Sequence, residues 1–238
     1  MPEVGVLDLP FLFENDREQI VVLNGRGGDP FREAAEQRDL VILAFIPGGF
    51  RDFATSFPFR TVEDLRGRRI RVIESPELIG MAESWGAIGI PMPFPEVYTG
   101  LQHGTVHGLD NAPDTIAALR FFEPAPYYTI TRHGSWSTVI MVSKIWFYSL
   151  PEDVREQVRQ AALQVAERSE EMRVPWVEWA LETVSSRGAE VTTLPEAERE
   201  KMRELALSNV WQKILADPVK GPILEHLTRE IEAYRAAR

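Results

Sequence analysis

The stretch RRIRVIESPELIGMAESWGAIGIPMPFPEVYTGLQHGTVHGLDN (Arg68–Asn111) decides the fold. Its apolar runs and turn residues predict a strand, a helix, a short strand, a second helix and a further strand. The first helix is predicted to start at Ser75-Pro76-Glu77, which supplies a cap, a proline at the first position and an acid. Strands and helices that alternate with short connections are typical of α/β proteins with a largely parallel sheet. Binding sites in such sheets lie beyond the carboxyl ends of the strands. We therefore expect a site near Arg71, within the first strand, and Asn111, after the last one.

Arg71 is the most informative residue of this stretch, because it lies between Ile70 and Val72 in an apolar strand pattern. A buried charge is costly unless an anion compensates it. The planar guanidinium group matches a carboxylate and binds it bidentately. Two interpretations stay open. Either a ligand carboxylate compensates the charge of Arg71, or an internal acid such as Glu74 or Asp110 does.

Two further candidate binding residues lie on either side of Arg71 in the sequence. Arg51 follows a Gly-Gly-Phe turn, and Asn111 supplies an amide at a strand-to-helix junction. Together with Arg71 they offer enough donors for both oxygens of a carboxylate. The aromatic residues of the same region form either the walls of a pocket or ordinary core; they are Phe50, Phe94, Tyr98 and Trp136.

The segments outside the central stretch predict further elements. Residues 40–46 form a buried strand that ends at the turn 48–50, and residues 127–132 and 138–143 form two separate strands. Residues 151–187 form one long amphipathic helix, which Pro175 is expected to bend. A helix of this length is expected to span two lobes. Two C-terminal helices are expected at residues 195–216 and 223–237.

Composition excludes several classes of function. The chain has 238 residues, a net charge of -10 and no cysteine. Disulfides, thiolate catalysis and cysteine metal sites are therefore excluded, and nucleic-acid binding through a basic surface is disfavoured. No apolar run reaches the length of a membrane-spanning helix, and no signal peptide pattern follows Met1. Taken literally, these features indicate a cytoplasmic protein.

Catalytic patterns are weak. His103 and His107 are interrupted by Gly104, which disfavours a metal pair, and no metal or cofactor is expected. The segment HGSWS (133–137) lacks the second glycine of a nucleophile elbow. A competing hypothesis is an α/β enzyme in which Arg71 only positions a carboxylate substrate and His103 or His107 acts as acid or base.

Several motifs carry a family resemblance. In chain order they are LPFLF (9–13), GFRDFATS (49–56), IRVIESPELI (70–79), IPMPFPEVYTGLQHGTVHGLDN (90–111) and LRFFEPAPYYTITRH (119–133). Through about residue 187 the chain resembles the solute-binding proteins of TRAP transporters, DctP type. The resemblance implies an α/β two-lobe periplasmic-binding-protein-like fold with a long helix spanning both lobes. Lobe I would comprise residues 1–48 and 137–176, and lobe II residues 49–136 and 177–238.

The resemblance also implies the function and the binding residues. The chain would be a non-enzymatic, monomeric periplasmic protein that captures a small carboxylate and delivers it to the membrane subunits of a TRAP permease. The family's main carboxylate-binding arginine corresponds to Arg71 and its second, more variable arginine to Arg51. Its amide ligand corresponds to Asn111 and a pocket-wall aromatic to Phe94. The position three residues after the main arginine, often a ligand contact, is Glu74.

The chain departs from the family pattern at a few positions. The usual VDGxEN is VHGLDN, with His107 and Asp110, and the usual LQTG is LQHG, with His103. Family members carry a secretion signal and the first strands of lobe I before the LPFLF segment. We therefore expect an N-terminally truncated chain with an incomplete lobe I, for which a non-functional fragment is a further alternative.

Overall fold

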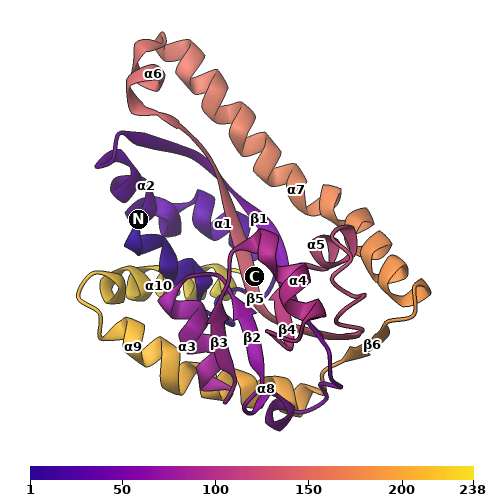
Figure 1. The fold of residues 1–238 in the computed structure, drawn as a ribbon. Helices are drawn as coiled ribbons and strands as arrows, with labels where there is room; N and C mark the ends of the chain where they lie inside the picture. Colours follow the sequence, from indigo (N-terminus) through magenta and orange to yellow (C-terminus); the bar gives the residue numbers. More distant parts are fainter.

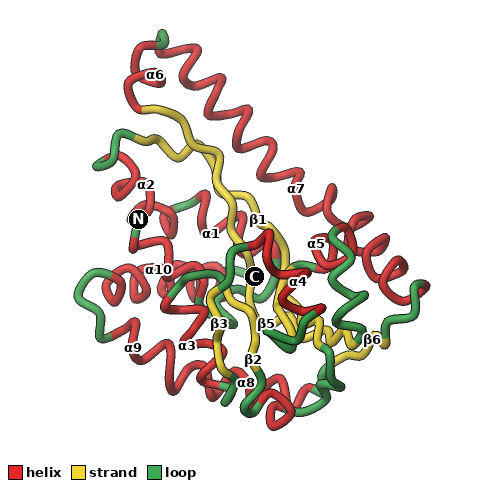
Figure 2. Tube along the Cα trace, viewed as in Figure 1, coloured by secondary structure: helices red, strands yellow, loops and turns green.

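The computed structural model describes residues 1–238 and contains one six-stranded sheet flanked by helices (Figures 1 and 2). The strands lie in the order β3-β2-β4-β1-β5-β6. Their bounds are β1 (Leu40–Thr55), β2 (Arg69–Val72), β3 (Ile88–Pro91), β4 (Gly108–Asn111), β5 (Tyr127–Ser143) and β6 (Glu190–Thr193). The predicted mixed α/β fold is confirmed.

The sheet is less parallel than the sequence indicated. β2 pairs in parallel with β3 and β4, and β5 pairs in parallel with β6. β1, however, runs antiparallel to both of its neighbours, β4 and β5. The prediction of a largely parallel sheet was wrong on this point because the longest strand pair of the molecule joins β1 directly to β5.

β1 and β5 are each one long strand where the sequence predicted shorter pieces. β1 continues past Gly48 and Gly49 to Thr55, and β5 runs unbroken from Tyr127 to Ser143. Their pairing shifts register at three places, one of them between Pro47 and Gly49. Such bulges bend a strand without ending it, so the glycines that suggested a turn mark an irregularity within the strand.

Ten α-helices surround the sheet. They are α1 (Asp16–Asn24), α2 (Asp29–Glu36), α3 (Pro76–Ser84), α4 (Val97–Gln102), α5 (Pro113–Ala118), α6 (Lys144–Ser149), α7 (Glu152–Ser186), α8 (Glu196–Ala206), α9 (Gln212–Leu215) and α10 (Lys220–Ala236). Pro76 opens α3, as the Ser-Pro-Glu sequence predicted. The predicted helix at 195–216 contains a π-helical turn at Leu207–Trp211 between α8 and α9.

Helix α7 is the longest element, with 35 residues. It starts at the tip of an arm, formed by the outer ends of β1 and β5 with α6, and runs back to the body of the molecule near β6 (Figure 1). It passes through Pro175 as one helix. Its small buried residues lie on one face; they are Ala162, Ala166, Ser169, Ala180 and Val184. The long helix predicted from the apolar spacing is thus present.

The apolar core is divided among several clusters. Neighbouring residues of β1 point to opposite faces of the sheet, so Phe53 contributes to a cluster with β2 and α3 while Ala54 contributes to one with α4, α5 and α7. The largest cluster joins the N-terminal segment and β1 to the C-terminal helices; its members include Phe45 of β1 and Leu224, Leu227 and Ile231 of α10. It links segments predicted for different lobes, and the lobe boundaries stay a prediction.

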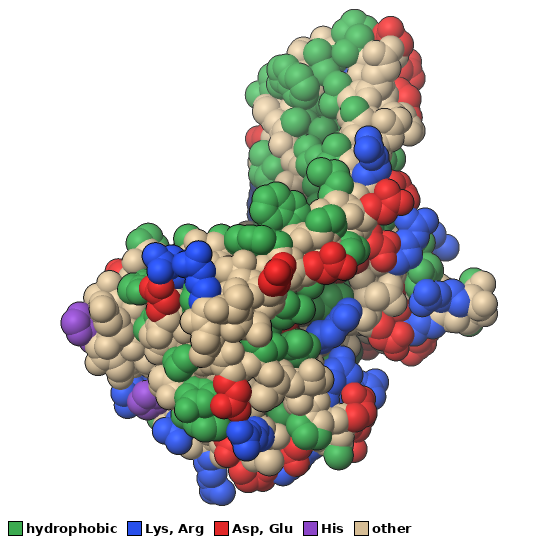
Figure 3. Space-filling model, turned by 90° about the vertical axis from the view of Figure 1, so that its right-hand side faces the viewer, with side chains coloured by type: hydrophobic (Ala, Val, Ile, Leu, Met, Phe, Trp, Pro, Cys, Tyr) green, Lys and Arg blue, Asp and Glu red, His purple; other side chains and the backbone are tan.

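Apolar side chains also gather on the surface of the arm (Figure 3). The most exposed large apolar side chains of the whole chain are Ile145 in α6 and Met172 and Trp176 in α7, with exposed fractions of 78%, 62% and 59%. None of the helices combines the length and the apolar character that crossing a membrane would require.

Candidate ligand-binding site

Arg71 lies on the central part of the sheet, where β2 is flanked by two parallel strands. Its register partners are Ile90 in β3 and Leu109 in β4. Ile70 and Val72 point into the apolar cluster on one face of the sheet. Because side chains alternate along a strand, Arg71 points to the other face. It is nevertheless only 3% exposed.

The guanidinium group of Arg71 is incompletely bonded. Nε and Nη2 both donate to the carbonyl oxygen of Met92, at 3.1 and 2.9 Å. Nη1 is buried and has no hydrogen-bond partner. Burial lowers the pKa of Arg71, and the nearby positive charge of Arg51 lowers it further, while Asp110 opposes both. No carboxylate lies within 4.0 Å, so neither Glu74 nor Asp110 forms the ion pair that one interpretation expected.

A hollow of about 570 Å³ lies beside Arg71. It is lined by Arg71, Ile73, Glu74, Pro91, Met92, Pro93, Phe94 and Trp136. The ring of Phe94 packs against the guanidinium group, with 5.5 Å from Arg71 Cζ to the ring centroid. Three of the predicted site residues, Arg71, Phe94 and Glu74, are therefore brought together. The volume is in the range of small-molecule sites.

Arg51 lies on β1 and is buried in an ion pair with Asp110. Its Nε donates to Asp110 Oδ2 at 2.5 Å, and its Nη2 donates to the Asp110 carbonyl oxygen at 3.2 Å. His133 Nε2 lies 3.2 Å from the same Oδ2 atom. Burial alone would raise the pKa of Asp110, but Arg51 and His133 outweigh it and hold that pKa well below its usual range. The charge of Arg51 is thus compensated within the protein.

Arg51 also lines a second hollow, of about 310 Å³. This hollow shares Ile73 and Trp136 with the first one, so the two are adjoining parts of one cleft. Asp8 lines the second part and accepts a hydrogen bond from Ser75 Oγ at 3.2 Å. Burial raises the pKa of Asp8, an effect that Arg51 partly offsets.

Asn111, the last residue of β4, is buried and lines neither part of the cleft. Its Oδ1 accepts a hydrogen bond from the backbone N–H of Ala112 at 2.8 Å. This bond fixes the orientation of the amide and leaves its NH₂ group as the donor available for other contacts.

The remaining aromatic candidates divide into two groups. Trp136 lines both parts of the cleft. Phe50 is buried beneath the guanidinium group of Arg132, and Tyr98 donates a hydrogen bond to Glu123 at 2.7 Å. Phe50 and Tyr98 therefore make structural contacts, which agrees with the interpretation of some of the aromatic residues as ordinary core.

The two histidines of the enzyme hypothesis lie outside the cleft. The backbone N–H of Arg69 donates to His107 Nδ1 at 3.0 Å, and Arg69 Nη2 lies 3.0 Å from Nε2. Burial and the charge of Arg69 lower the pKa of His107. His103 is exposed at the end of α4. Neither residue lines the hollow beside Arg71.

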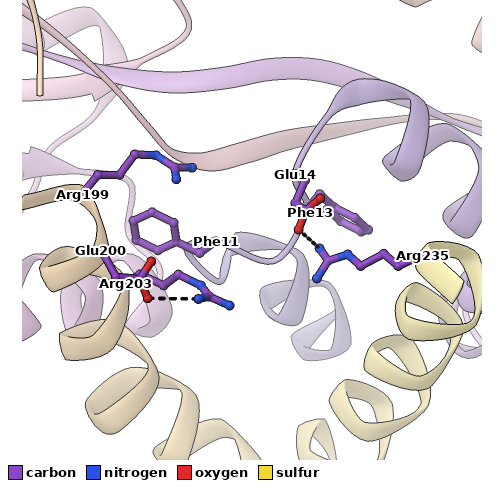
Figure 4. A pocket seen from close by; sticks show the side chains of 7 residues that line it. All are labelled: Phe11, Phe13, Glu14, Arg199, Glu200, Arg203 and Arg235. Carbon is purple, nitrogen blue, oxygen red and sulfur yellow. Dashed lines mark hydrogen bonds and ion pairs between the residues drawn. The ribbon is translucent and has the colours of Figure 1, made fainter. Parts of the chain in front are cut away.

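A separate hollow of about 330 Å³ lies between the N-terminal segment and helices α8 and α10 (Figure 4). It contains three arginines, yet each one has an acidic partner. Arg235 pairs with Glu14 and Glu18, Arg203 with Glu200, and Arg199 with Glu196. No uncompensated cation remains there, which distinguishes this hollow from the one beside Arg71.

Sequence reasoning missed several contributors to the cleft, among them Met92, Asp8 and Ile73. Met92 acts through its backbone carbonyl, which carries no residue-type signal. Asp8 and Ile73 reach the cleft through the fold: Asp8 ends the N-terminal turn Pro2–Asp8, and Ile73 directly follows β2. Only the position of Ile73 beside Arg71 could have indicated it in advance.

Comparison with known proteins gives a consistent assignment. Residues 1–217 match the family model described as bacterial extracellular solute-binding protein, family 7 (DctP). The chain is 27% identical over 232 residues to the 2,3-diketo-L-gulonate-binding periplasmic protein of Escherichia coli, covering 97% of this chain and 70% of that protein. It is 31% identical over 217 residues to the C4-dicarboxylate-binding periplasmic protein of Vibrio cholerae, covering 89% of this chain and 64% of that protein.

A solved structure agrees with these relatives. The TRAP periplasmic solute-binding protein of Desulfovibrio salexigens with bound orotic acid superimposes with a TM-score of 0.90 at 29% identity, covering 99% of this chain and 76% of that one. Among the curated relatives, the chain spans from about half to 70% of their length.

Proposed function

The chain belongs to the family 7 bacterial extracellular solute-binding proteins (DctP), and from this membership we propose that it captures a small organic acid by its carboxylate and delivers it to a TRAP-type membrane transporter. We place this activity in the periplasm, as the names of the relatives indicate for those proteins. We further propose that the protein acts as a monomer and performs no covalent chemistry. The exclusion of His103 and His107 from the cleft supports the last point.

The observation that carries this proposal is the unpartnered Nη1 atom of Arg71. Met92 occupies the Nε and Nη2 side of the guanidinium group. The end formed by Nη1 and Nη2 is left for a ligand, and this end matches the two oxygens of a carboxylate. A ligand carboxylate there would compensate a buried charge that the protein itself leaves unpaired.

The other predicted residues take supporting roles in this proposal. Arg51, held by Asp110, and the NH₂ group of Asn111 would donate hydrogen bonds to ligand oxygens. Phe94 forms an apolar wall that lowers the local dielectric and strengthens the contact with Arg71. Glu74, on the rim of the hollow, would accept hydrogen bonds from the ligand.

The ligands named for the relatives support the choice of a carboxylate. They are 2,3-diketo-L-gulonate, a C4-dicarboxylate and orotic acid. These compounds differ in size, ring content and polarity, and the carboxylate is the group they share. The contact with Arg71 is therefore the part of the interaction that we carry over to this chain.

Calorimetric titration with a panel of organic acids tests the proposal. We expect Arg71→Ala to weaken binding of the accepted acid by more than about thirtyfold, because loss of one partner of a buried charge pair costs about 2–5 kcal/mol. Arg66→Ala, at an exposed position before β2, is the matched control and should bind as the unmodified chain does. Equal affinity of the Arg71→Ala variant would overturn the assignment, and turnover of any acid would overturn the non-enzymatic function.

A further inference from the structure

We propose that Asp8 is a proton-binding group in the wall of the cleft, and that capture of an acid is accompanied by the uptake of a proton at Asp8. This inference rests on the function proposed above and makes that function depend on pH. It comes from a chain of hydrogen-bonding groups that runs from the cleft wall into the interior of the protein.

The chain consists of Asp8, Ser75, Glu77 and Lys220. Asp8 ends the N-terminal turn and lines the part of the cleft that contains Arg51. Ser75 Oγ, just before α3, lies 3.2 Å from Asp8 Oδ2 and 2.9 Å from Glu77 Oε2. The other oxygen of Glu77, Oε1, accepts a hydrogen bond from Lys220 Nζ. One hydroxyl group thus lies between two carboxyl groups.

The Ser75 hydroxyl has a single hydrogen to share between these two acids. A hydroxyl donates one hydrogen bond and accepts others through its lone pairs. Glu77 is only 2% exposed and forms a buried ion pair with Lys220. An ionised acceptor forms the stronger hydrogen bond, and the distance from Ser75 to Glu77 is the shorter of the two. Glu77 is therefore the favoured acceptor of this hydrogen.

This arrangement suits Asp8 best in its protonated form. Neutral Asp8 can donate from Oδ2 to Ser75 Oγ while Ser75 donates to Glu77, so that both contacts of the hydroxyl are hydrogen bonds. Ionised Asp8 can accept the hydrogen only by taking it from Glu77. The side chain of Asp8 has Ser75 as its one hydrogen-bond partner and takes part in no ion pair. The protein therefore offers a place for a proton on Asp8.

The charges around Asp8 favour the same form. Burial raises the pKa of Asp8, Arg51 of β1 opposes this effect, and Glu77 and Asp110 add to it, so that the pKa lies above its usual value. Titratable groups on other elements packed against the N-terminal turn are bonded elsewhere: His133 of β5 to Asp110, Lys220 of α10 to Glu77, and Arg38, just after α2, to Glu3.

A ligand carboxylate in the cleft strengthens the preference for neutral Asp8. The hollow beside Arg71 adjoins the part that Asp8 lines, and a like charge nearby favours the protonated form of a carboxyl group. Because linkage is reciprocal, an anion that favours the proton is itself bound more tightly when the proton is present. The affinity for an acid is thus highest below the pKa of Asp8 and falls as the pH rises through it.

Calorimetric titrations from about pH 5 to about pH 8, where an ordinary carboxyl is ionised, measure this linkage. The probes are orotate, D-galacturonate and pyruvate, whose carboxyl groups keep their charge throughout. We expect the Kd of the acid that binds to rise at least about fivefold across this range. Titrations at one pH in two buffers of different ionisation enthalpy should show net proton uptake. This comparison uses the unmodified chain, so it decides the inference even if a variant does not fold.

Asp8→Asn fixes the side chain in a neutral form, because the amide NH₂ group can donate to Ser75 Oγ as protonated Asp8 does. At the high end of the pH range it should bind the acid at least as tightly as the unmodified chain. Its Kd should change less than about twofold across the range, without proton uptake. The variant retains every histidine, so a pH dependence caused by histidine would remain in it. Asp39→Asn, at an exposed position that lines neither part of the cleft, is the matched control and should keep the full pH dependence.

The outcomes distinguish this inference from the function on which it rests. An acid that binds with constant affinity and without proton uptake overturns the proton site, while the carboxylate-binding function stands. A pH dependence that persists in Asp8→Asn assigns the proton to another group and overturns the role of Asp8. Weaker binding by Asp8→Asn at every pH shows that ionised Asp8 holds the ligand and overturns it too. Absence of binding by every acid, here and in the wider panel, overturns the proposed function and this inference together.

Discussion

Arg51 and Asp110, which are 59 residues apart in the sequence, form a buried ion pair with 2.5 Å between Nε and Oδ2. The pair joins β1 to β4 beneath the cleft, and His133 of β5 contacts the same carboxylate. Three strands are thus connected through one acid. The pair holds Arg51 in place beside the cleft and compensates its charge there.

Asp110→Asn is expected to destabilise the protein strongly. The substitution leaves the guanidinium group of Arg51 buried without its counter-charge, and loss of one partner of a buried pair costs roughly 3–5 kcal/mol. Urea unfolding at neutral pH measures the change. Glu63→Gln removes the exposed pair with Lys201 and should leave the urea unfolding curve nearly unchanged, because solvent screens exposed ion pairs. Superimposable unfolding curves for Asp110→Asn and the unmodified chain would contradict the role of the pair.

Arg71→Met is expected to leave the ligand-free protein as stable as before, or to stabilise it. Arg71 carries an unpaired buried charge, and its replacement by an apolar side chain of similar length removes the desolvation cost. Arg69→Met, two residues earlier on β2, is the matched comparison. The guanidinium group of Arg69 donates to the carbonyl oxygens of Thr105 and Gly104 at 2.7 Å, so its loss should lower stability.

Urea unfolding midpoints of both variants, measured with and without a saturating amount of the acid that the unmodified chain binds in calorimetry, check this difference. Arg71→Met should lose the stabilisation that a bound acid gives, whereas Arg69→Met should retain it. A ligand-free Arg71→Met variant that unfolds at clearly lower urea than Arg69→Met would show that Arg71 serves the fold rather than the ligand.

The pH dependence of stability should reflect His107. Burial and the charges of Arg69 and Arg68 lower its pKa in the folded protein, whereas the unfolded imidazole titrates near about 6.5. Below that pH the unfolded chain binds the proton first, so the contribution of His107 to stability is present above pH ~6.5 and is lost as the pH falls.

His107→Asn keeps an acceptor near the backbone N–H of Arg69 but does not titrate. We therefore expect the unmodified chain to lose more stability than this variant when urea unfolding is repeated from about pH 7 to about pH 5. The same substitution at the exposed His103 serves as the control. Parallel pH profiles for the unmodified chain and His107→Asn would refute the assignment.

Gly49→Ala is expected to destabilise more than Gly67→Ala. Both glycines have positive φ, of 98° and 70°, a conformation that costs a residue with a Cβ about 1 kcal/mol or more. A Cβ on Gly67 would meet open space, whereas one on Gly49 would overlap Arg173 Nη2.

Arg173 would have to give up its bonds to Gly48 and Asp16 to make room for that Cβ. The thermal unfolding midpoints of Gly49→Ala and Gly67→Ala are the measurement. Both variants share the cost of positive φ, so the difference between their midpoints reports the steric overlap with Arg173. Equal midpoints for the two variants would show that Arg173 moves aside without cost.

The local patterns of the chain predicted much of the fold. Ser75 and Pro76 marked the start of α3, the apolar spacing from Val154 onward marked α7, and the strand around Arg71 was expected where β2 lies. These features depend on residues close in sequence, through capping, periodicity and backbone preference. The same kind of reasoning failed at Gly48 and Gly49, because only pairing with β5 carries β1 through them.

What the sequence determined by itself about the site is that Arg71 is a charge inside an apolar strand. What only the tertiary structure decided is which acid forms an ion pair with which arginine. Asp110 was a candidate partner of Arg71. The antiparallel pairing of β1 with β4 instead places Asp110 beside Arg51, and these two residues form the ion pair. Because ion pairing falls off within a few ångströms, partners are set by strand order and register, which no local pattern encodes. Arg71 is left buried with Nη1 unbonded as a result of that arrangement.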